Sequence, residues 1–285
     1  MSGVIANVEP GAEAEREGVK SEPLVDAVLA ELRQLGVPQE DVGSQADVAT
    51  VRRYLAARHN NPQKAARLLA GTLKWRKEFK TDTLRIGEFD GRSLSSGRMY
   101  IAGNDPAGKS ILVTRKRSDA FQAGEYDSYL RYLVFTLQTG ERAMQGGQDK
   151  WVWLMDMKGY SRANSPPLGV SMATLRILAD HFPERLHRCF FIDAPSIFSF
   201  LFNALWPFID PVTRQKIVFI QTKDFAGQIE AVQAAGEDEA KREEALAAAG
   251  NKEDADAFVN YLRWYCAPYD EAAYRALLAS VGWSE

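Results

Sequence analysis

The sequence predicts an α/β domain that follows a smaller helical module. Apolar residues recur at helical spacing before residue 80. From about residue 98, short runs rich in β-branched and aromatic residues alternate with helical segments, as they do in α/β sheets. The chain has 285 residues, of which 46% are hydrophobic and 26% are charged, so it can build a sizeable core.

Three helices are expected before residue 80. The first covers residues 24–35 and the second covers about 48–55, each with apolar side chains on one stripe. The third starts at Asn61 and Pro62, which suit the cap and the first turn of a helix, and it runs to about Phe79. Together these helices form the N-terminal module.

Five short runs predict strands, and they occupy residues 99–102, 111–114, 151–156, 189–193 and 216–220. Residues 151–156 are almost wholly apolar, which is typical of a strand buried on both faces, and we expect residues 216–220 to be buried as well. Helices are expected at residues 126–144, 169–182 and 271–281. This alternation predicts a mixed or parallel sheet.

The predicted organisation has four parts. Residues 1–22 are polar and are expected to form a disordered tail. Residues 23–80 form the helical module, and residues 81–231 form the α/β domain. Residues 232–285 form a charged segment and a C-terminal helix.

Composition excludes several classes of protein. Lys and Arg number 35 against 38 Asp and Glu, so the strongly basic balance of a nucleic-acid binder is missing. Two cysteines are too few for a disulfide framework or a thiolate metal cluster, and they favour a reducing, cytoplasmic setting. The first residues do not resemble a secretory signal, and no run approaches the roughly 18 apolar residues that cross a bilayer. Any membrane contact is therefore expected to be peripheral.

One segment imitates a phosphate-binding loop. Gly103 to Ser110 satisfies the pattern G-x-x-x-x-G-K-S of nucleotide hydrolases. Such a loop needs a helix that begins at its Lys-Ser pair, whereas Lys109 and Ser110 run straight into a predicted strand. We therefore interpret the segment as a hairpin turn and keep a nucleotide-hydrolysing enzyme as the weaker alternative.

No catalytic or metal-binding residues are predicted. Only His59, His181 and His187 could carry a proton at neutral pH, and each is expected to be structural or solvated. No serine lies in a G-x-S-x-G elbow, and no His or Cys pair has metal-ligand spacing. The sequence gives no support for enzyme chemistry, a metal or a cofactor.

Residues 196–208 form an unusual helix with hardly any polar face. Its apolar side chains are Ile197, Phe198, Phe200, Leu201, Phe202, Leu205, Trp206 and Phe208. Such a helix is either fully buried, or it covers an apolar ligand with one face while the other face can meet lipid. Pro195 and Pro207 confine it between joints that could act as hinges.

Two cationic positions could hold an anion. Arg58 continues the apolar stripe of its helix, where a charge must find a partner. Asp210 and Pro211 predict a helix start that places Thr213 and Lys216 on one face, and a hydroxyl beside an ammonium suits a phosphate. The alternative is that Lys216 forms a salt bridge with Glu184 or with Asp210.

Four segments carry a specific pattern: the arginine-rich stretch at residues 51–79, MDMKGYS at 155–161, HFPERLHRCFFIDAP at 181–195 and WPFIDPVTRQKI at 206–217. Read together, they resemble the CRAL-TRIO lipid-binding family, particularly its yeast-type phosphatidylinositol/phosphatidylcholine transfer proteins. The resemblance implies a CRAL-TRIO fold, in which a helical bundle precedes a sheet that floors an apolar pocket. It also implies that residues 196–208 are the gate helix over the pocket mouth.

The resemblance also implies roles for single residues. Arg58, Thr213 and Lys216 match the positions that hold the inositol phosphate, and His59 replaces a basic residue beside them. An ion pair between Glu184 and Lys216 is expected next to the gate.

The choline-binding positions differ from those of the family. The resemblance places Leu112, Trp151 and Trp153 in the pocket, where relatives that bind phosphatidylcholine carry hydroxyls. An indole cannot accept a hydrogen bond as a hydroxyl does, so phosphatidylcholine is expected to bind weakly or not at all.

The expected function is binding of phosphatidylinositol and its transfer between membranes, or its presentation to a lipid kinase. The expected protein is a cytoplasmic monomer that carries a phospholipid ligand, contacts membranes transiently and binds no nucleic acid. The alternative on the same fold is a carrier of a sterol, a tocopherol-like molecule or another hydrophobic ligand.

Overall fold

A computed structural model of the chain describes residues 22–89, 91, 93–115, 123–236, 238–248 and 258–285. The chain divides into two compact units, one that ends at Ala66 and one that runs from Arg67 to Glu285. This division falls inside one long helix, α4 (Pro62–Phe79). The polar tail expected at residues 1–22 lies outside the described residues except for its last residue, Glu22.

The first unit contains α1 (Pro23–Gln34), α2 (Gln39–Gln45), α3 (Val48–Ala56) and the start of α4. Helices α1 and α3 bury their apolar stripes, and the Asn61 side chain caps α4 by accepting the N–H of Lys64 at 2.9 Å. These three helices confirm the prediction. The seven-residue helix α2 was not predicted, because its sequence QEDVGSQ offers a single apolar residue and a glycine.

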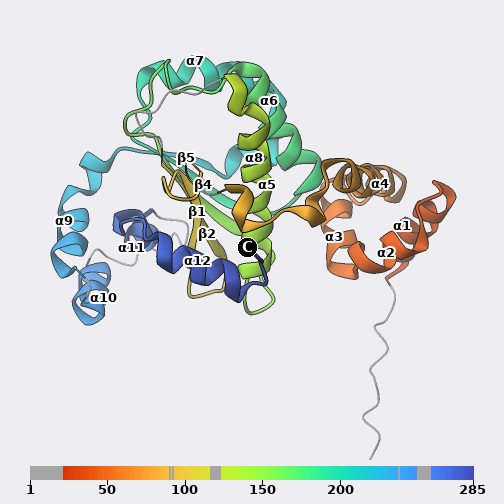
Figure 1. Cartoon of the computed structure of the whole chain (residues 1–285), viewed down its shortest axis with the longest axis horizontal. Helices are drawn as coiled ribbons and strands as arrows, with labels where there is room; N and C mark the ends of the chain where they lie inside the picture. Colours follow the sequence, from red (N-terminus) through yellow and green to blue (C-terminus); the bar gives the residue numbers. More distant parts are fainter. Residues whose placement is uncertain (1–21, 90, 92, 116–122, 237, 249–257) are drawn as a thin grey trace, which may run out of the picture. The chain divides into compact units, whose positions relative to one another are not determined.

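The second unit is built on one five-stranded sheet with the order β1-β2-β3-β4-β5 (Figure 1). The strands are β1 (Met99–Asn104), β2 (Ser110–Arg115), β3 (Trp151–Asp156), β4 (Leu186–Ile192) and β5 (Ile217–Ile220). Strand β1 is antiparallel to β2, whereas all other neighbours are parallel. The sheet is therefore mixed, as predicted.

Strand β5 differs from the prediction of a buried strand. It is the edge of the sheet and has no neighbour beyond it among the described strands. Its four residues are only partly covered, and the Phe219 side chain is 50% exposed. A run of apolar residues also occurs in an edge strand whose side chains contact another part of the protein or a ligand. The pattern alone therefore does not distinguish an edge strand from a buried one.

The turn between β1 and β2 confirms the hairpin interpretation. The Asp105 carboxylate accepts the N–H groups of Ala107 at 3.0 Å and Lys109 at 2.8 Å, which closes the turn. Gly108 has a φ of 91°, a left-handed conformation that favours glycine. Because Lys109 leads into β2 and not into a helix, the segment lacks the helix start of a phosphate loop.

Three helical connections cover one face of the sheet. They contain α5 (Tyr126–Ala143), α6 (Leu168–Arg176) and α7 (Ser196–Leu205) and lead from β2 to β3, β3 to β4 and β4 to β5. Parallel strands are joined by right-handed crossovers, and here each crossover adds the next strand on the same side. The helices of such a series must all lie on one face, as Figure 1 shows for this sheet.

The opposite face is covered by C-terminal helices. They follow in the order α9 (Ala226–Ala235), α10 (Glu239–Ala248), α11 (Leu262–Cys266) and α12 (Glu271–Ser280). Helix α11 lies against β2 and α12 against β1, while α9 and α10 pack on α11. Phe190 of β4 contacts Phe258 and Tyr261, while Tyr100 of β1 contacts Tyr274. Only α12 was predicted, because α9 and α10 are short, rich in alanine and only weakly amphipathic.

Trp283, close to the end of the chain, packs against α5. Its indole N–H donates to the Thr139 hydroxyl at 2.9 Å, and the Arg142 guanidinium lies 3.7 Å from its ring centroid. Replacing this buried residue with alanine should cost about 3–5 kcal/mol of unfolding free energy, which lowers the melting temperature by about 5–15 °C. Thermal unfolding measures the shift, and Trp283→Phe should recover most of it. Equal melting temperatures for wild type and Trp283→Ala would contradict this packing.

Candidate functional site

Helix α7 leads into a bent connection. A short turn of 3₁₀ helix, η5 (Trp206–Phe208), and the helix α8 (Pro211–Gln215) follow it before β5. Pro195 stands at the N-cap position of α7, so no side-chain hydrogen bond caps the first turn of this helix. Pro207 lies inside η5, where it ends the regular helix because proline has no N–H.

The inner face of α7 packs on the sheet through Phe198, Phe202 and Leu205, which are all buried. The Phe198 ring lies 5.1 Å from the Phe191 ring of β4, and the Phe202 ring lies 5.2 Å from the Phe219 ring of β5. These contacts are wholly apolar, so they can be exchanged for other apolar contacts without leaving a polar group unpaired.

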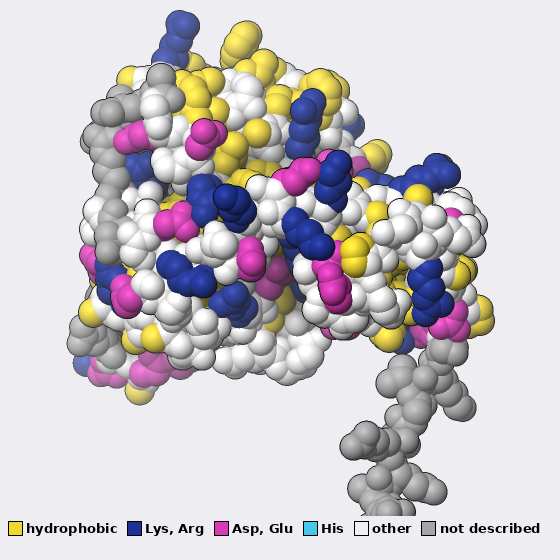
Figure 2. All heavy atoms as spheres, turned by 45° about the vertical axis from the view of Figure 1, so that its right-hand side comes forward, with side chains coloured by type: hydrophobic (Ala, Val, Ile, Leu, Met, Phe, Trp, Pro, Cys, Tyr) yellow, Lys and Arg dark blue, Asp and Glu magenta, His cyan; other side chains and the backbone are white. Residues whose placement is uncertain are grey.

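The outer face of α7 exposes large apolar side chains to solvent. Phe200 is 85% exposed and Ile197 is 43% exposed, and the following turn exposes Phe208 at 63% and Trp206 at 36%. We call these four residues the outer patch. Hydrophobic side chains gather at the top of Figure 2, the end of this unit at which α7 lies in Figure 1.

Of the two predicted readings for α7, the structure fits the one with two different faces. The inner face lies on the sheet, and the outer face is free to meet another apolar phase. Leu201 is half-buried and packs on the core between the two faces. The side chains of the outer patch mark an interaction surface, because soluble proteins rarely expose large apolar residues so close together.

The predicted anion-binding residues Thr213 and Lys216 lie at α8. The Asp210 carboxylate caps this helix by accepting the Thr213 N–H at 2.9 Å, as predicted. Burial acts to raise the pKa of Asp210, but hydrogen bonds from Thr213 and Val212 and the charge of Lys216 outweigh it, so the pKa is lowered. Asp210 therefore stays ionised beside Thr213.

The expected ion pair between Glu184 and Lys216 is present, with Nζ 3.3 Å from Oε2. It joins the turn before β4 to the residue before β5, so it fixes the point at which the α7 connection returns to the sheet. The Glu184 carbonyl also accepts the Lys150 ammonium at 2.8 Å. Lys216 thus shares its charge with two carboxylates, those of Glu184 and Asp210.

Arg58 and His59 lie in the other unit. Helix α3 ends at Ala56, which corrects the expectation that Arg58 continues it. His59 and Asn60 have positive φ values of 51° and 58°, so the chain turns here toward α4. The Arg58 guanidinium donates to the Ala57 carbonyl at 2.8 Å. Thr213 and Lys216 belong to the second unit, so the convergence of Arg58 with them stays a prediction.

The predicted pocket residues Leu112, Trp151 and Trp153 lie in the core. They are 1%, 2% and 6% exposed, so a ligand cannot contact much of them in this conformation. Gly140 of α5 lies against the sheet here, since a Cβ at this position would be 3.3 Å from the Ile101 side chain and 3.6 Å from the Trp151 ring. The Trp153 indole donates to the Thr114 hydroxyl at 2.8 Å. The face of the sheet at these residues is thus covered by α5, and it does not line an open pocket.

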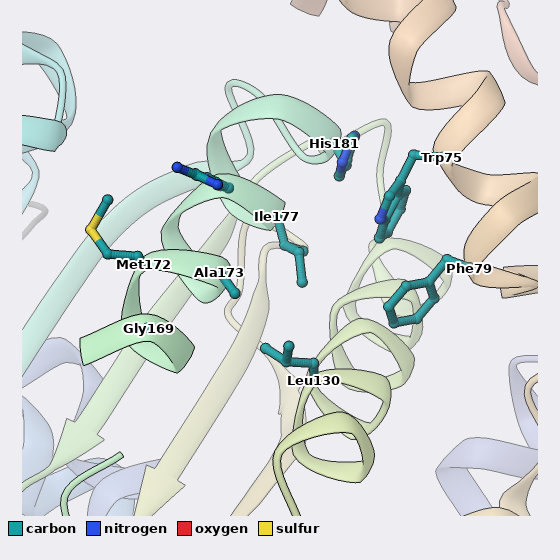
Figure 3. A pocket seen from close by; sticks show the side chains of 9 residues that line it. Trp75, Phe79, Leu130, Gly169, Met172, Ala173, Ile177 and His181 are labelled. Atoms are coloured by element: carbon teal, nitrogen blue, oxygen red, sulfur yellow. The ribbon is translucent and has the colours of Figure 1, made fainter. Parts of the chain in front are cut away.

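A groove of about 480 Å³ opens between the end of α4, α5 and α6 (Figure 3). Trp75, Phe79, Leu130, Ala173 and Ile177 give it a largely apolar wall. A methylene occupies roughly the volume of a water molecule, about 30 Å³, so two acyl chains of about 16 carbons need about 900 Å³. This groove is therefore too small for a whole phospholipid.

Comparison with known proteins identifies the sheet and its crossovers. Residues 94–235 match the CRAL/TRIO domain. The chain contains a CRAL/TRIO domain. The crystal structure of Sfh5 has a TM-score of 0.54 at 17% identity and covers 73% of this chain and 83% of its own, which shows the same fold.

Curated relatives match the CRAL/TRIO domain and its surroundings. A CRAL-TRIO domain-containing protein of Schizosaccharomyces pombe is 28% identical over 172 residues, which make up 60% of this chain and 17% of that protein. Phosphatidylinositol transfer protein PDR17 of Saccharomyces cerevisiae is 27% identical over 181 residues, 59% of this chain and 50% of PDR17. Phosphatidylinositol/phosphatidylcholine transfer protein SFH12 of Arabidopsis thaliana is 27% identical over 189 residues, 60% of this chain and 35% of SFH12. This chain therefore spans half or less of the length of these relatives.

Within the CRAL/TRIO domain, the described residues hold no group of three or more His, Cys, Asp or Glu side chains that could bind a metal. None of the described helices is long and apolar enough to span a bilayer. The most exposed members of the outer patch, Phe200 and Phe208, lie within the predicted gate helix, residues 196–208, but the apolar run alone did not separate them from its inward-facing residues. A helical wheel anchored on Phe198, Phe202 and Leu205 would have placed Phe200 on the opposite side.

His181 is structural in the CRAL/TRIO domain. Its ring stacks on Trp75 at 3.8 Å, and its Nδ1 lies 3.1 Å from the Thr72 hydroxyl. Burial, with a smaller contribution from the charge of Arg76, lowers the pKa of His181 from 6.5 to about 4. The ring therefore stays neutral in the folded protein above that pH.

This depressed pKa predicts a pH dependence of stability. Between pH 6.5 and about 4, the unfolded chain binds a proton on His181 that the folded chain does not, so the free energy of unfolding falls as the pH falls through this window. His181→Gln should be less sensitive to the change. Urea unfolding at about pH 7 and about pH 5 tests this, and an equal loss of stability in both proteins would refute it.

Proposed function

We propose that this protein encloses a phospholipid under α7 and moves it between membranes, with phosphatidylinositol as the preferred cargo. The observation that carries the proposal is the pair of apolar faces on α7. The inner face rests on the sheet only through apolar contacts, while the outer patch is exposed. A helix of this kind can leave the sheet where a bilayer is present to receive it.

The energetics of lipid transfer fit such a device. Exposing two acyl chains of about 16 carbons to water costs about 25 kcal/mol, at about 0.8 kcal/mol per methylene. A carrier avoids this cost by offering the acyl chains a surface about as apolar as the interior of the membrane. Acyl chains that enter under α7 would replace its contacts with Phe191 of β4 and Phe219 of β5. Phe219, already half exposed, marks the edge at which they would enter.

The outer patch supplies the membrane contact. Transferring its four partly exposed side chains into lipid should yield about 4–8 kcal/mol, since a fully buried large apolar side chain contributes about 1.5–3 kcal/mol. A myristoyl chain, with an association constant of about 10⁴ M⁻¹, binds membranes in the same range and reversibly. Transient association suits a carrier that must leave again with its cargo.

A phosphate headgroup needs more than Lys216. This ammonium is shared with Glu184 and Asp210, so the local charge at α8 does not favour an anion. We propose that Arg58, with His59 beside it, supplies the missing positive charge when the cargo is bound, and that the Thr213 hydroxyl donates a further hydrogen bond. Charge-assisted hydrogen bonds of this kind are each worth about 1.5–3 kcal/mol.

The names of the relatives support the class of cargo. PDR17 is a phosphatidylinositol transfer protein, and SFH12 is a phosphatidylinositol/phosphatidylcholine transfer protein. We propose weak or no binding of phosphatidylcholine, because Leu112, Trp151 and Trp153 carry no hydroxyl and are all buried in the core. The second candidate is a carrier of a sterol or tocopherol-like molecule, for which the anion-binding residues would have no use.

We further propose that the protein acts without catalysis, metal or cofactor other than its lipid, as a cytoplasmic monomer. Presentation of the lipid to a lipid kinase is a proposed role that would use the same opening of α7. No nucleic acid is expected as a partner.

A transfer assay tests the proposed function. Donor vesicles carry either labelled phosphatidylinositol or labelled phosphatidylcholine, and label that appears in acceptor vesicles is followed over time. The proposal expects transfer of the inositol lipid and little transfer of the choline lipid. Transfer of neither, or preferred transfer of a sterol in a parallel assay, would reject phosphatidylinositol as the cargo.

A further inference from the structure

The turn that follows α7 has unusual hydrogen-bonding needs. Pro207 interrupts the helix, so the last carbonyl groups of α7 and η5 lack the N–H partners of a continuing helix. Trp206 keeps one such partner, because its carbonyl accepts the Ile209 N–H at 3.1 Å. Apart from that bond, the carbonyls of Trp206 and Ile209 depend on groups from outside the turn.

Arg214 of α8 meets these needs. Its Nε donates to the Ile209 carbonyl at 2.8 Å, and a terminal nitrogen donates to the Trp206 carbonyl at 2.9 Å. The guanidinium also lies 4.9 Å from the centroid of the Trp206 ring, a cation–π contact. One side chain therefore holds the turn through two carbonyls and one aromatic face.

Arg214 is itself held firmly. The backbone N–H of Arg214 donates to the Asp210 carbonyl at 3.0 Å as part of α8, and the Asp210 carboxylate caps the same helix. The residue that follows α8, Lys216, is tied to Glu184. The C-terminal end of α7 is thus connected through Arg214 to a short helix that is fixed at both of its ends.

The N-terminal end of α7 is attached differently. No side chain caps its first turn, and its buried contact is the Phe198 ring against Phe191 and Tyr160. The nearest polar anchor lies before Pro195, where the Asp193 carboxylate accepts the Thr222 hydroxyl at 2.6 Å. This end is therefore held by contacts that an acyl chain could replace.

We propose that Arg214 is a positioning residue that makes the C-terminal end of α7 a fixed pivot, so that the helix opens from its N-terminal end. The proposal rests on the proposed function, in which α7 leaves the sheet. Opening at the N-terminal end exchanges one apolar contact for another. Opening at the C-terminal end would break two charge-assisted hydrogen bonds and take the side-chain donor away from both carbonyls.

Distance measurements between spin labels test this pivot. One label is placed at Ser199 or at Ala204, which are exposed on the two halves of α7, and the second at exposed Ala279 on α12. Cys266 is replaced with serine so that only the introduced cysteines react, while Cys189 is buried. In the lipid-free protein, Arg214→Gln should widen the distance distribution from Ala204 by about twofold, and Arg214→Lys should have an intermediate effect.

Arg188→Gln is the matched control, because Arg188 donates to the carbonyl of Gln215 in the same connection, whereas Arg214 donates to the carbonyls of Trp206 and Ile209. It should leave the distribution unchanged. On addition of phosphatidylinositol vesicles to the wild type, the distance from Ser199 should change more than the distance from Ala204, and Arg214→Gln should remove this difference.

An unchanged distribution from Ala204 in lipid-free Arg214→Gln would overturn the role of Arg214. So would equal movement of the two ends of α7 in the wild type. The lipid-free measurement needs no cargo, so its failure can be told apart from a failure of lipid transfer, which the vesicle assay measures independently.

Discussion

Arg58→Gln should lower the rate of phosphatidylinositol transfer by about 10- to 150-fold, the equivalent of one charge-assisted hydrogen bond to the headgroup phosphate. Arg58→Glu should abolish it, since the reversed charge would add repulsion to the loss of the bond. The reason lies at α8, where Lys216 already shares its charge with Glu184 and Asp210. A phosphate can be held there only if another cation joins. The vesicle transfer assay measures the rate.

Arg52→Gln is the matched control for this prediction. Arg52 lies on α3, the helix that ends just before Arg58, and pairs with Glu22 at the surface at 2.6 Å. Exposed pairs of this kind contribute little to stability, so the variant should transfer phosphatidylinositol as the wild type does. If Arg58→Gln also transfers normally, while circular dichroism shows that both variants are folded, Arg58 does not hold the headgroup.

Lys216 needs its own control, because its alanine variant also breaks the pair with Glu184. Glu184→Gln breaks the same pair but leaves Lys216 free to meet an anion. If Lys216 binds the phosphate, Lys216→Ala should impair transfer strongly, whereas Glu184→Gln should maintain or increase it. Equal losses in the two variants would mean that the ion pair has only a structural role.

Replacing Phe200 and Phe208 together with aspartate should weaken binding to vesicles by at least 100-fold. The two side chains are 85% and 63% exposed, so the change costs little folding stability. It removes about 2–4 kcal/mol of membrane contact and places two charges at the surface that meets lipid. Co-sedimentation with vesicles measures the binding, and transfer should fall with it.

Leu35→Asp provides a comparison for the outer patch. Leu35 is 47% exposed at the end of α1 and belongs to the other unit. Its replacement adds a charge at an exposed apolar site outside the outer patch, so binding to vesicles should remain. A similar loss in both proteins would show that the binding is not specific to α7.

The sequence predicts the strands well because their signals are local. All five strands lie at the predicted residues, with β4 beginning three residues earlier than expected. The helix from Pro62 to Phe79 also matches, because an asparagine cap and a proline in the first turn define its start. The C-terminal helices α9 and α10 escaped prediction, since alanine-rich segments carry almost no periodic signal.

The site is less predictable because it depends on the surroundings of each side chain. Leu112 and Trp151 were assigned to a pocket by position in the chain, yet α5 covers them in this conformation. The two faces of α7 depend on which neighbours Phe198 and Phe200 meet, and an apolar run does not reveal that. Pro207 marks the turn after α7 in the sequence, but Arg214 had no signal of its own, because both of its acceptors there are backbone carbonyls.

The most direct test of a lipid carrier is the identity of what it carries. The purified chain is incubated with vesicles that contain phosphatidylinositol, phosphatidylcholine and a sterol, separated from them, and weighed intact by native mass spectrometry. We expect one phosphatidylinositol molecule on each protein chain. A protein that returns without lipid, or that carries only sterol, would contradict the account.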